Sequence, residues 1–174
     1  MVVEFGFGEI ALQEEKLIIN FLKEWTVRYV RNKDIFEKQI IALKEFDKSF
    51  FVKYKTKSSL YVIEPFVENF SKLIQDSEAL QQKHELVIVL FNTSKNLERT
   101  ISEWKVLSQM KELKLLFVNP FSSTDIKWMV APYIHNIVGE ERSIARGLKS
   151  MFAMVEPLTD TGVGKIVKKG VKSN

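Results

Sequence analysis

Two acidic residues flank the most strand-like stretch of the sequence, and acids in that position could bind a divalent metal ion. Asp47 precedes residues 50–55, in which apolar and polar side chains alternate, and Glu64 follows residues 60–63, which are apolar on both sides. These patterns indicate two β-strands, and the polar residues 55–59 indicate a turn between them. Carboxylates are ligands that Mg²⁺ takes from proteins. Asp47 and Glu64 are therefore the candidates for a metal site on a β-hairpin.

Residues 46–66 also resemble the hairpin of the PD-(D/E)XK nucleases. In that family an Asp and an acid-x-Lys triplet on the next strand bring two carboxylates and an ammonium to one point, where the acids hold Mg²⁺. The resemblance implies these acidic roles for Asp47 and Glu64. It departs at the triplet, which reads Glu64-Pro65-Phe66, so a phenylalanine replaces the lysine. The family core also has three strands before its next helix, whereas two are expected here. The resemblance implies a diverged and inactive relative.

Lysines give the same hairpin another interpretation, as the edge of a sheet. Lys53 and Lys55 point away from the expected core, and Lys57 lies in the turn. Lysines on an edge strand block pairing with other sheets, and the same side chains can contact phosphates. Because the first hairpin strand is expected at the edge, edge protection is the simpler interpretation and contact with nucleic acid is the functional one.

A second group of lysines lies near the C-terminus, at Lys165, Lys168 and Lys169. Residues beyond Pro157 are expected to form a loose basic tail. The formal net charge is +4 and the pI is about 9.1, which permits contact with nucleic acid without requiring it. A non-specific nucleic-acid arm is the functional interpretation of this tail.

Polar residues follow the two most apolar expected strands, at the ends where α/β proteins bind ligands. They are Asn92, Thr93 and Ser94 after one strand, and Asn119, Ser122 and Ser123 after the other. Free backbone N–H groups of the following helices could hold an anion there. The same residue types are the usual helix N-caps, so capping alone also explains them. Neither loop has the glycines of a dinucleotide site.

Composition excludes several classes of site. The chain has no cysteine, which rules out disulfides and thiolate metal sites, and only two histidines, His84 and His135, which are far apart in sequence. No assembled catalytic set is visible and no cofactor is expected. No apolar run approaches the length of about 20 residues that a membrane span needs. We expect a soluble, cytoplasmic protein that does not bind membranes, with a thermophile-like content of Lys and Glu.

The expected elements follow from hydrophobic periodicity. Helices are expected at residues 9–31, 34–46, 67–82, 94–111 and 140–155. Strands are expected at residues 50–55, 60–63, 86–91 and 113–118. Asp34 is expected to cap the second helix. Residues 122–138 form either one helix kinked at Pro132 or a short strand followed by a helix.

These elements predict an α/β fold with a mixed sheet of about four or five strands, a β-hairpin followed by a βαβ unit. Helices should cover both faces, after an N-terminal helical pair. The expected organisation is a helical segment 1–46, an α/β core 47–157 and a basic tail 158–174. The expected function is a non-enzymatic binding module that contacts nucleic acid or a second copy of itself. The alternatives are the diverged nuclease-like domain and an enzyme with a dispersed site at the strand ends.

Overall fold

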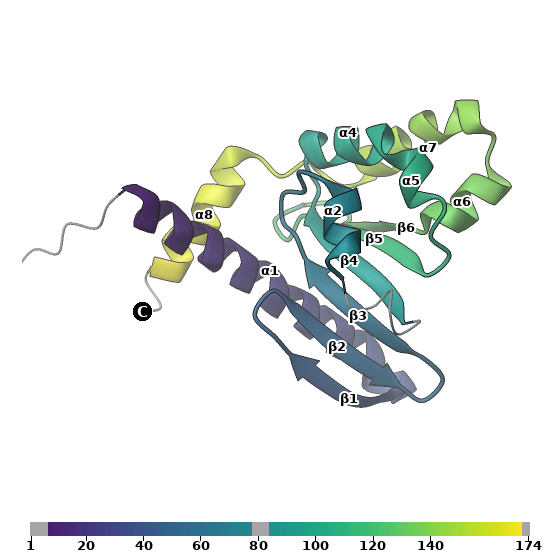
Figure 1. Cartoon of the computed structure of the whole chain (residues 1–174). Coiled ribbons are helices and arrows are strands. Elements are labelled where there is room, and N and C mark those ends of the chain that lie inside the picture. The colour runs from purple at the N-terminus through teal and green to yellow at the C-terminus, as the bar shows by residue number, and fades with distance from the viewer. Residues whose placement is uncertain (1–6, 78–83, 172–174) are drawn as a thin grey trace, which may run out of the picture.

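A six-stranded mixed sheet forms the centre of the molecule (Figure 1). The computed structural model describes residues 7–77 and 84–171. The strands lie in the sheet in the order in which they occur in the chain: β1 (Ile40–Glu45), β2 (Ser49–Tyr54), β3 (Ser58–Ile63), β4 (Glu85–Phe91), β5 (Leu113–Val118) and β6 (Lys127–Val130). β1, β2 and β3 are antiparallel, β3, β4 and β5 are parallel, and β6 returns antiparallel to β5. The predicted α/β class and mixed sheet are confirmed, with six strands instead of four or five.

A long helix, α1 (Phe7–Glu37), packs along one face of this sheet. Its apolar residues recur every three or four positions and so lie on one side of the helix. On that side Ile19, Leu22 and Val30 are buried against the sheet. The helix ends where Lys38 takes a left-handed backbone conformation, with φ of 48°. The Asp34 carboxylate accepts hydrogen bonds from the next two backbone N–H groups, at 2.7 and 3.0 Å. Asp34 therefore stabilises the end of α1.

The predicted second helix at residues 34–46 is wrong. Its first residues are the last turn of α1, and the rest is β1, which pairs with β2. Residues 42–45 are good helix formers, but Ile40 and Ile41 are β-branched and favour a strand. Pairing with β2, in which Leu43 lies beside Val52, decides between these preferences. The first hairpin strand is therefore β2, an interior strand, and the edge of the sheet is β1.

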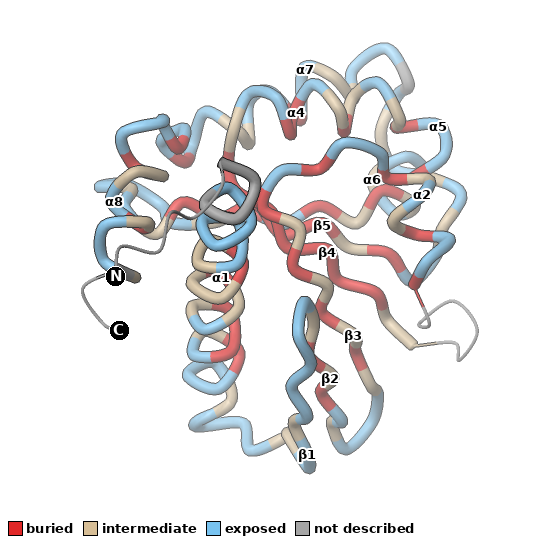
Figure 2. Tube along the Cα trace, turned by 60° about the vertical axis from the view of Figure 1, so that its left-hand side comes forward, coloured by how far each residue is buried: buried red, intermediate tan, exposed pale blue. Residues whose placement is uncertain are grey.

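The opposite face of the sheet is covered by a second helical layer (Figure 2). It consists of α2 (Phe70–Gln75), α4 (Ser94–Ser102), α5 (Trp104–Leu107), α6 (Pro132–Val138) and α7 (Glu141–Met154). These helices pack on β3 to β6, where Leu86, Ile88 and Phe117 are almost fully buried. Figure 2 shows that the same face of β1 and β2 has no described helix over it. Helices thus cover both faces, as predicted, but unevenly.

The C-terminal half resolves one open alternative and contradicts one prediction. Residues 122–138 form strand β6 followed by helix α6, which begins at Pro132, so the strand-plus-helix alternative is confirmed. Residues 160–171 form a helix, α8 (Asp160–Val171), which packs on α1, so the prediction of a loose tail is wrong for this segment. Ile166 is buried in this contact and Gly170 lies directly against Leu17. The apolar stripe of α8 is short, so the sequence pattern alone does not indicate a helix there. A helix of this length is stable because its apolar side packs on α1.

A buried asparagine ties the ends of β3 and β4 together. The Asn96 amide donates to the carbonyl oxygens of Pro65 and Phe91, both at 2.8 Å, and accepts from the N–H of Val67 at 3.0 Å. Asn96 is almost fully buried, so water cannot replace these bonds. The position of Glu64, next to Pro65, depends on this tie.

We predict that Asn96→Ala lowers the free energy of unfolding by about 3 kcal/mol, because it leaves the buried N–H of Val67 without a partner and removes one of the two hydrogen bonds that each of the Pro65 and Phe91 carbonyl oxygens accepts. Urea denaturation measures the change. Asn32→Ala, at an exposed position on α1, is the control and should change stability by less than about 0.5 kcal/mol. A loss for Asn96→Ala as small as that of the control would show that the tie contributes little.

Candidate functional site

The two acids of the hairpin lie at one corner of the sheet. Asp47 is in the turn between β1 and β2, and Glu64 directly follows β3. The N–H of Ile63 donates to the carbonyl oxygen of Lys48 at 2.9 Å, so the two chain segments are neighbours. Glu15 of α1 joins them, since its carboxylate is 3.2 Å from the Lys48 ammonium. The corner therefore combines acids from three elements with two lysines, since Lys23 of α1 donates to the carbonyl oxygens of Phe46 and Asp47 at 2.9 and 3.2 Å.

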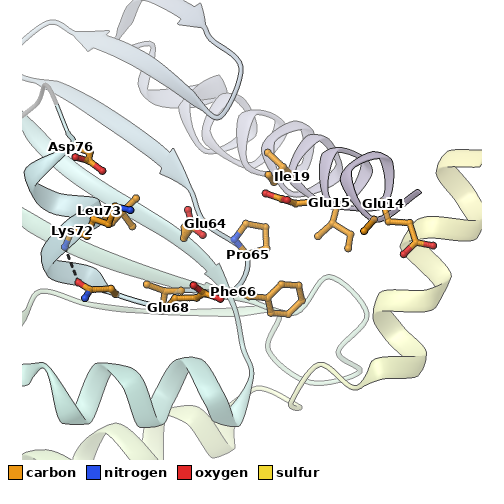
Figure 3. A pocket seen from close by; sticks show the side chains of 14 residues that line it. Glu14, Glu15, Ile19, Glu64, Pro65, Phe66, Glu68, Lys72, Leu73 and Asp76 are labelled. Atoms are coloured by element: carbon orange, nitrogen blue, oxygen red, sulfur yellow. Dashed lines mark hydrogen bonds between the residues drawn. The ribbon is translucent and has the colours of Figure 1, made fainter. Parts of the chain in front are cut away.

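Beside this corner is a groove of about 690 Å³ between the N-terminal half of α1, the end of β3 and α2. We call it the acidic groove. Its charged lining residues are Glu14, Glu15, Glu64, Glu68, Lys72 and Asp76 (Figure 3). Apolar side chains, among them Phe66 and Leu73, form the rest of the lining. Five carboxylates against one ammonium give the groove a negative potential that disfavours phosphates.

Burial and neighbouring charges change the pKa of the Glu64 carboxyl group. Partial burial raises the pKa of its carboxyl group above the usual value. The Lys48 ammonium acts in the opposite direction, whereas Glu15 and Glu68 raise the pKa further. Glu64 therefore holds its charge in the folded protein at an energetic cost.

The charges at this corner differ from those of a PD-(D/E)XK nuclease centre. The number of strands before the next helix, however, is the number expected for that family. Three strands, β1 to β3, precede α2, so the expected departure in strand number was wrong. Phe66 lines the groove at the position where the family has lysine. Within residues 7–77 and 84–171, no three Asp, Glu or His side chains are close enough together to hold a metal ion. Lys48 is instead the cation that lies among Glu15 and Glu64.

The lysines predicted to contact nucleic acid fall into two separate groups. Lys53 is exposed on β2 and Lys55 is exposed in the following turn, while Lys57 binds the Glu85 carboxylate at 3.2 Å. The other group, Lys165, Lys168 and Lys169, lies on α8. α8 contacts α1 at Leu17, whereas Lys57 lies by Lys33, roughly 24 Å further along the helix. The two groups therefore do not form one patch.

The group on β2 belongs to a larger surface, which we call the open face. It is the side of β1 and β2 that faces away from α1, and it carries Ala42, Lys44, Phe51 and Lys53. Ala42 lies beside Lys53 and Lys44 beside Phe51, so the two lysines are diagonal neighbours around an aromatic ring. The rings of His84 and Phe51 are in a T-shaped arrangement, with centroids 5.1 Å apart. The open face thus combines ammonium groups with a half-buried aromatic surface.

The sequence patterns did not indicate Lys44 of the open face or Glu15 of the acidic groove. Lys44 was assigned to a helix, although the β-branched pair at 40–41 was a signal for a strand that includes it. Glu15 was missed because an acid on a helix gives no local sign that it meets a hairpin. Only the packing of α1 on the sheet places it beside Lys48.

The predicted strand-end residues lie together, as neighbours of one another and of residues 155–158. The Asn92 amide donates to the carbonyl oxygen of Val155 at 2.9 Å and accepts from the Trp128 indole at 2.7 Å. The Asn119 amide donates to the carbonyl oxygen of Glu156. The polar atoms of both asparagines are thus used to attach this segment to the sheet.

The hydroxyl residues of these loops have similar structural partners. Thr93 caps α4 by accepting from the N–H of Asn96, and Ser94 is the exposed first residue of that helix. Ser122 accepts from the N–H of Glu156 at 3.3 Å. Ser123 donates its N–H and hydroxyl to the Glu156 carboxylate at 3.0 and 2.6 Å, and these bonds lower the pKa of that acid.

The described part of the chain contains no helix long and apolar enough to cross a membrane. No protein-family model matches the sequence, and neither the curated proteins nor the solved structures include a significant match. The geometry of the open face and of the acidic groove is therefore the basis for any functional assignment.

We predict that Glu64→Gln stabilises the protein at neutral pH and not in acid. A carboxyl group whose folded pKa is raised contributes stability below its unfolded pKa and loses that contribution as the pH rises through the folded value. The stability of the variant relative to the native protein should thus rise between about pH 4 and pH 7. Urea denaturation across this range measures it.

Glu14→Gln is the control, because it removes the same charge from an exposed position of the same groove. Two results would contradict burial of Glu64 as the cause of the increased stability. One is an increase for Glu64→Gln that is independent of pH, and the other is an increase equal to that of Glu14→Gln.

Proposed function

We propose that this chain is a non-enzymatic binding module that holds single-stranded nucleic acid on the open face. The observation that carries the proposal is the placement of Lys44 and Lys53 around Phe51 on a sheet surface with no described helix over it. Single-stranded nucleic acids bind to surfaces that offer ammonium groups to the phosphates and aromatic rings to the bases. Lys55, in the adjoining turn, extends the positive charge.

The charges around the open face support this direction of binding. Within the described residues, Lys44 and Lys53 form no ion pair, and the Lys44 ammonium lies over the Phe46 ring, 5.3 Å from its centroid, so neither charge is neutralised by an acid. The acidic groove lies at the far end of β2, where it repels a phosphate backbone. A nucleic acid strand would therefore follow the lysines and avoid the groove.

The corner at Glu64 supports a module without catalysis. The Lys48 ammonium, held by Glu15 at 3.2 Å, supplies the positive charge that a metal ion would bring to the acids. Phe66 cannot stabilise the charge that develops during phosphodiester cleavage, as a lysine would. An arrangement of this kind retains acids without assembling them for metal catalysis.

The proposal predicts that Lys44→Gln combined with Lys53→Gln weakens binding of a labelled single-stranded oligonucleotide. Each lost phosphate contact reduces the salt dependence, so the slope of log K against log salt should fall by about 1.4 for the two. Fluorescence anisotropy at several salt concentrations measures both quantities.

Lys165→Gln combined with Lys168→Gln is the matched control, since it removes the same charge from exposed positions on α8. The control should leave the slope almost unchanged. If both double variants reduced the slope equally, the chain would bind through its net charge and the open face would have no special role.

A metal-dependent nuclease is the second candidate, favoured by the topology of three strands before α2 and by the nearness of Glu64 to the Asp47 turn. It predicts cleavage of nucleic acid with Mg²⁺ or Mn²⁺ that is lost in Glu64→Ala and retained in Glu14→Ala. Gel electrophoresis of a labelled substrate tests this. Cleavage that persists in EDTA or in Glu64→Ala would reject the corner as its source.

A further inference from the structure

A second cavity lies at the other end of β3, under the C-terminal half of α1. It has a volume of about 300 Å³, which is at the small end of the range for ligand sites. Its floor takes one side chain from each of four neighbouring strands: Tyr61, Val87, Leu116 and Met129. Tyr29 of α1 forms part of the wall. We call it the tyrosine pocket, and neither the open face nor the acidic groove includes any of these residues.

Two charged residues enter this pocket from a sheet face that is otherwise largely apolar. They are Glu85 of β4 and Lys114 of β5, with side chains that are only 12% and 30% exposed. The Glu85 carboxylate accepts from Lys114, from Lys57 at 3.2 Å and from the Ser59 hydroxyl at 3.0 Å. Two ammonium groups thus surround one carboxylate. The inner end of the pocket therefore has one more positive than negative charge, whereas the whole lining, which also includes Lys33, Asp34 and Glu37, has three positive and three negative groups.

The pKa of Glu85 supports the assignment of one negative charge to its carboxylate. Burial alone would raise the pKa of its carboxyl group, but the hydrogen bonds and charges of Lys114 and Lys57 lower it below the usual value. Glu85 is therefore ionised at neutral pH. The other charged groups at the pocket lie on α1: Lys33 and Glu37 have opposite signs, and the Asp34 carboxylate accepts from two backbone N–H groups.

Two tyrosine hydroxyls provide a second polar contact. The hydroxyls of Tyr54 and Tyr61 are 3.3 Å apart and share one hydrogen bond. Because only one of the two donates in that bond, the other keeps its proton for a further acceptor. Burial raises the pKa of Tyr61, so its hydroxyl stays protonated. The pocket can thus donate one neutral hydrogen bond in addition to those of its lysines.

We infer that the tyrosine pocket binds a small aromatic carboxylate. The ring would lie on the apolar floor of Val87, Leu116 and Met129, beside Tyr29, whose own ring is stacked on Trp25 and lies under the Lys127 ammonium, and the carboxylate would face the Lys114 ammonium. Lys114 donates one hydrogen bond to Glu85, and an ammonium has three donors, so two remain for a ligand. The size of the cavity limits the ligand to one or two rings. This site is independent of the proposed nucleic-acid function.

The test is a titration of the full ¹⁵N-labelled chain with 4-hydroxybenzoate, followed by NMR. Saturable shifts are expected at the floor residues, with a Kd at or below about 1 mM. The neutral analogue 4-hydroxybenzamide should bind at least about fivefold more weakly, because it lacks the charge. No saturation by the carboxylate, or equal binding of the amide, overturns the inference.

Two variants with opposite expected effects separate ligand contact from damage to the fold. Lys114→Gln should weaken binding of 4-hydroxybenzoate about fivefold, and Glu85→Gln should tighten it by a similar factor, since it removes a competing anion. Lys149→Gln, exposed on α7, is the control and should leave the Kd within about twofold. Weakening by both pocket variants would overturn the inference, because unfolding affects both in the same direction.

Discussion

The parallel pairing of β3 with β4 is the interaction on which the rest of the structure depends. It joins the antiparallel strands β1 to β3 to the strands and helices that follow. Its register, from Ser59 beside Glu85 to Ile63 beside Val89, fixes what lies at each end. One end leads to Glu64 and the acidic groove, where Asn96 attaches β3 to β4. The other end places Glu85 among its lysines in the tyrosine pocket.

The uneven helical cover determines which surface remains for a partner. α1 and α8 pack on one side of the sheet, and α2 and α4 to α7 pack on the other, over β3 to β6 (Figures 1 and 2). Because β1 and β2 extend beyond the second layer, their outer side chains remain accessible. The half-buried Phe51 ring on such a face offers an aromatic surface on which a partner can stack. Lys44 and Lys53 favour a partner that is negatively charged.

Long local patterns predicted the fold, and pairing between distant residues determined the rest. β4 and β5 were predicted from continuous apolar runs, and α1 from a long helical repeat. β1 was mistaken for a helix, since residues 42–45 favour a helix locally and only β2 makes them a strand. α8 was missed for the same reason, because its short apolar stripe depends on contact with α1. Local propensity is weak compared with such tertiary contacts.

The candidate sites were predictable only in part, for the same physical reason. Asp47, Glu64 and Lys53 were identified because a hairpin is local and its residues are close in sequence. Two other contacts join residues that are 29 or more positions apart in the sequence. Helix packing brings Glu15 beside Lys48, and strand register brings Glu85 beside Lys114. No pattern within a short window contains that information.

Salt-dependent binding without cleavage is the central expectation for this protein. The most direct measurement is the anisotropy of a labelled single-stranded oligonucleotide with the native protein and Mn²⁺, over a range of salt, followed by electrophoresis of the same samples. If the open face binds the strand, affinity falls linearly in log K against log salt and the oligonucleotide stays intact. Absence of binding at low salt would contradict nucleic acid as the partner. Cleavage would contradict a module without catalysis.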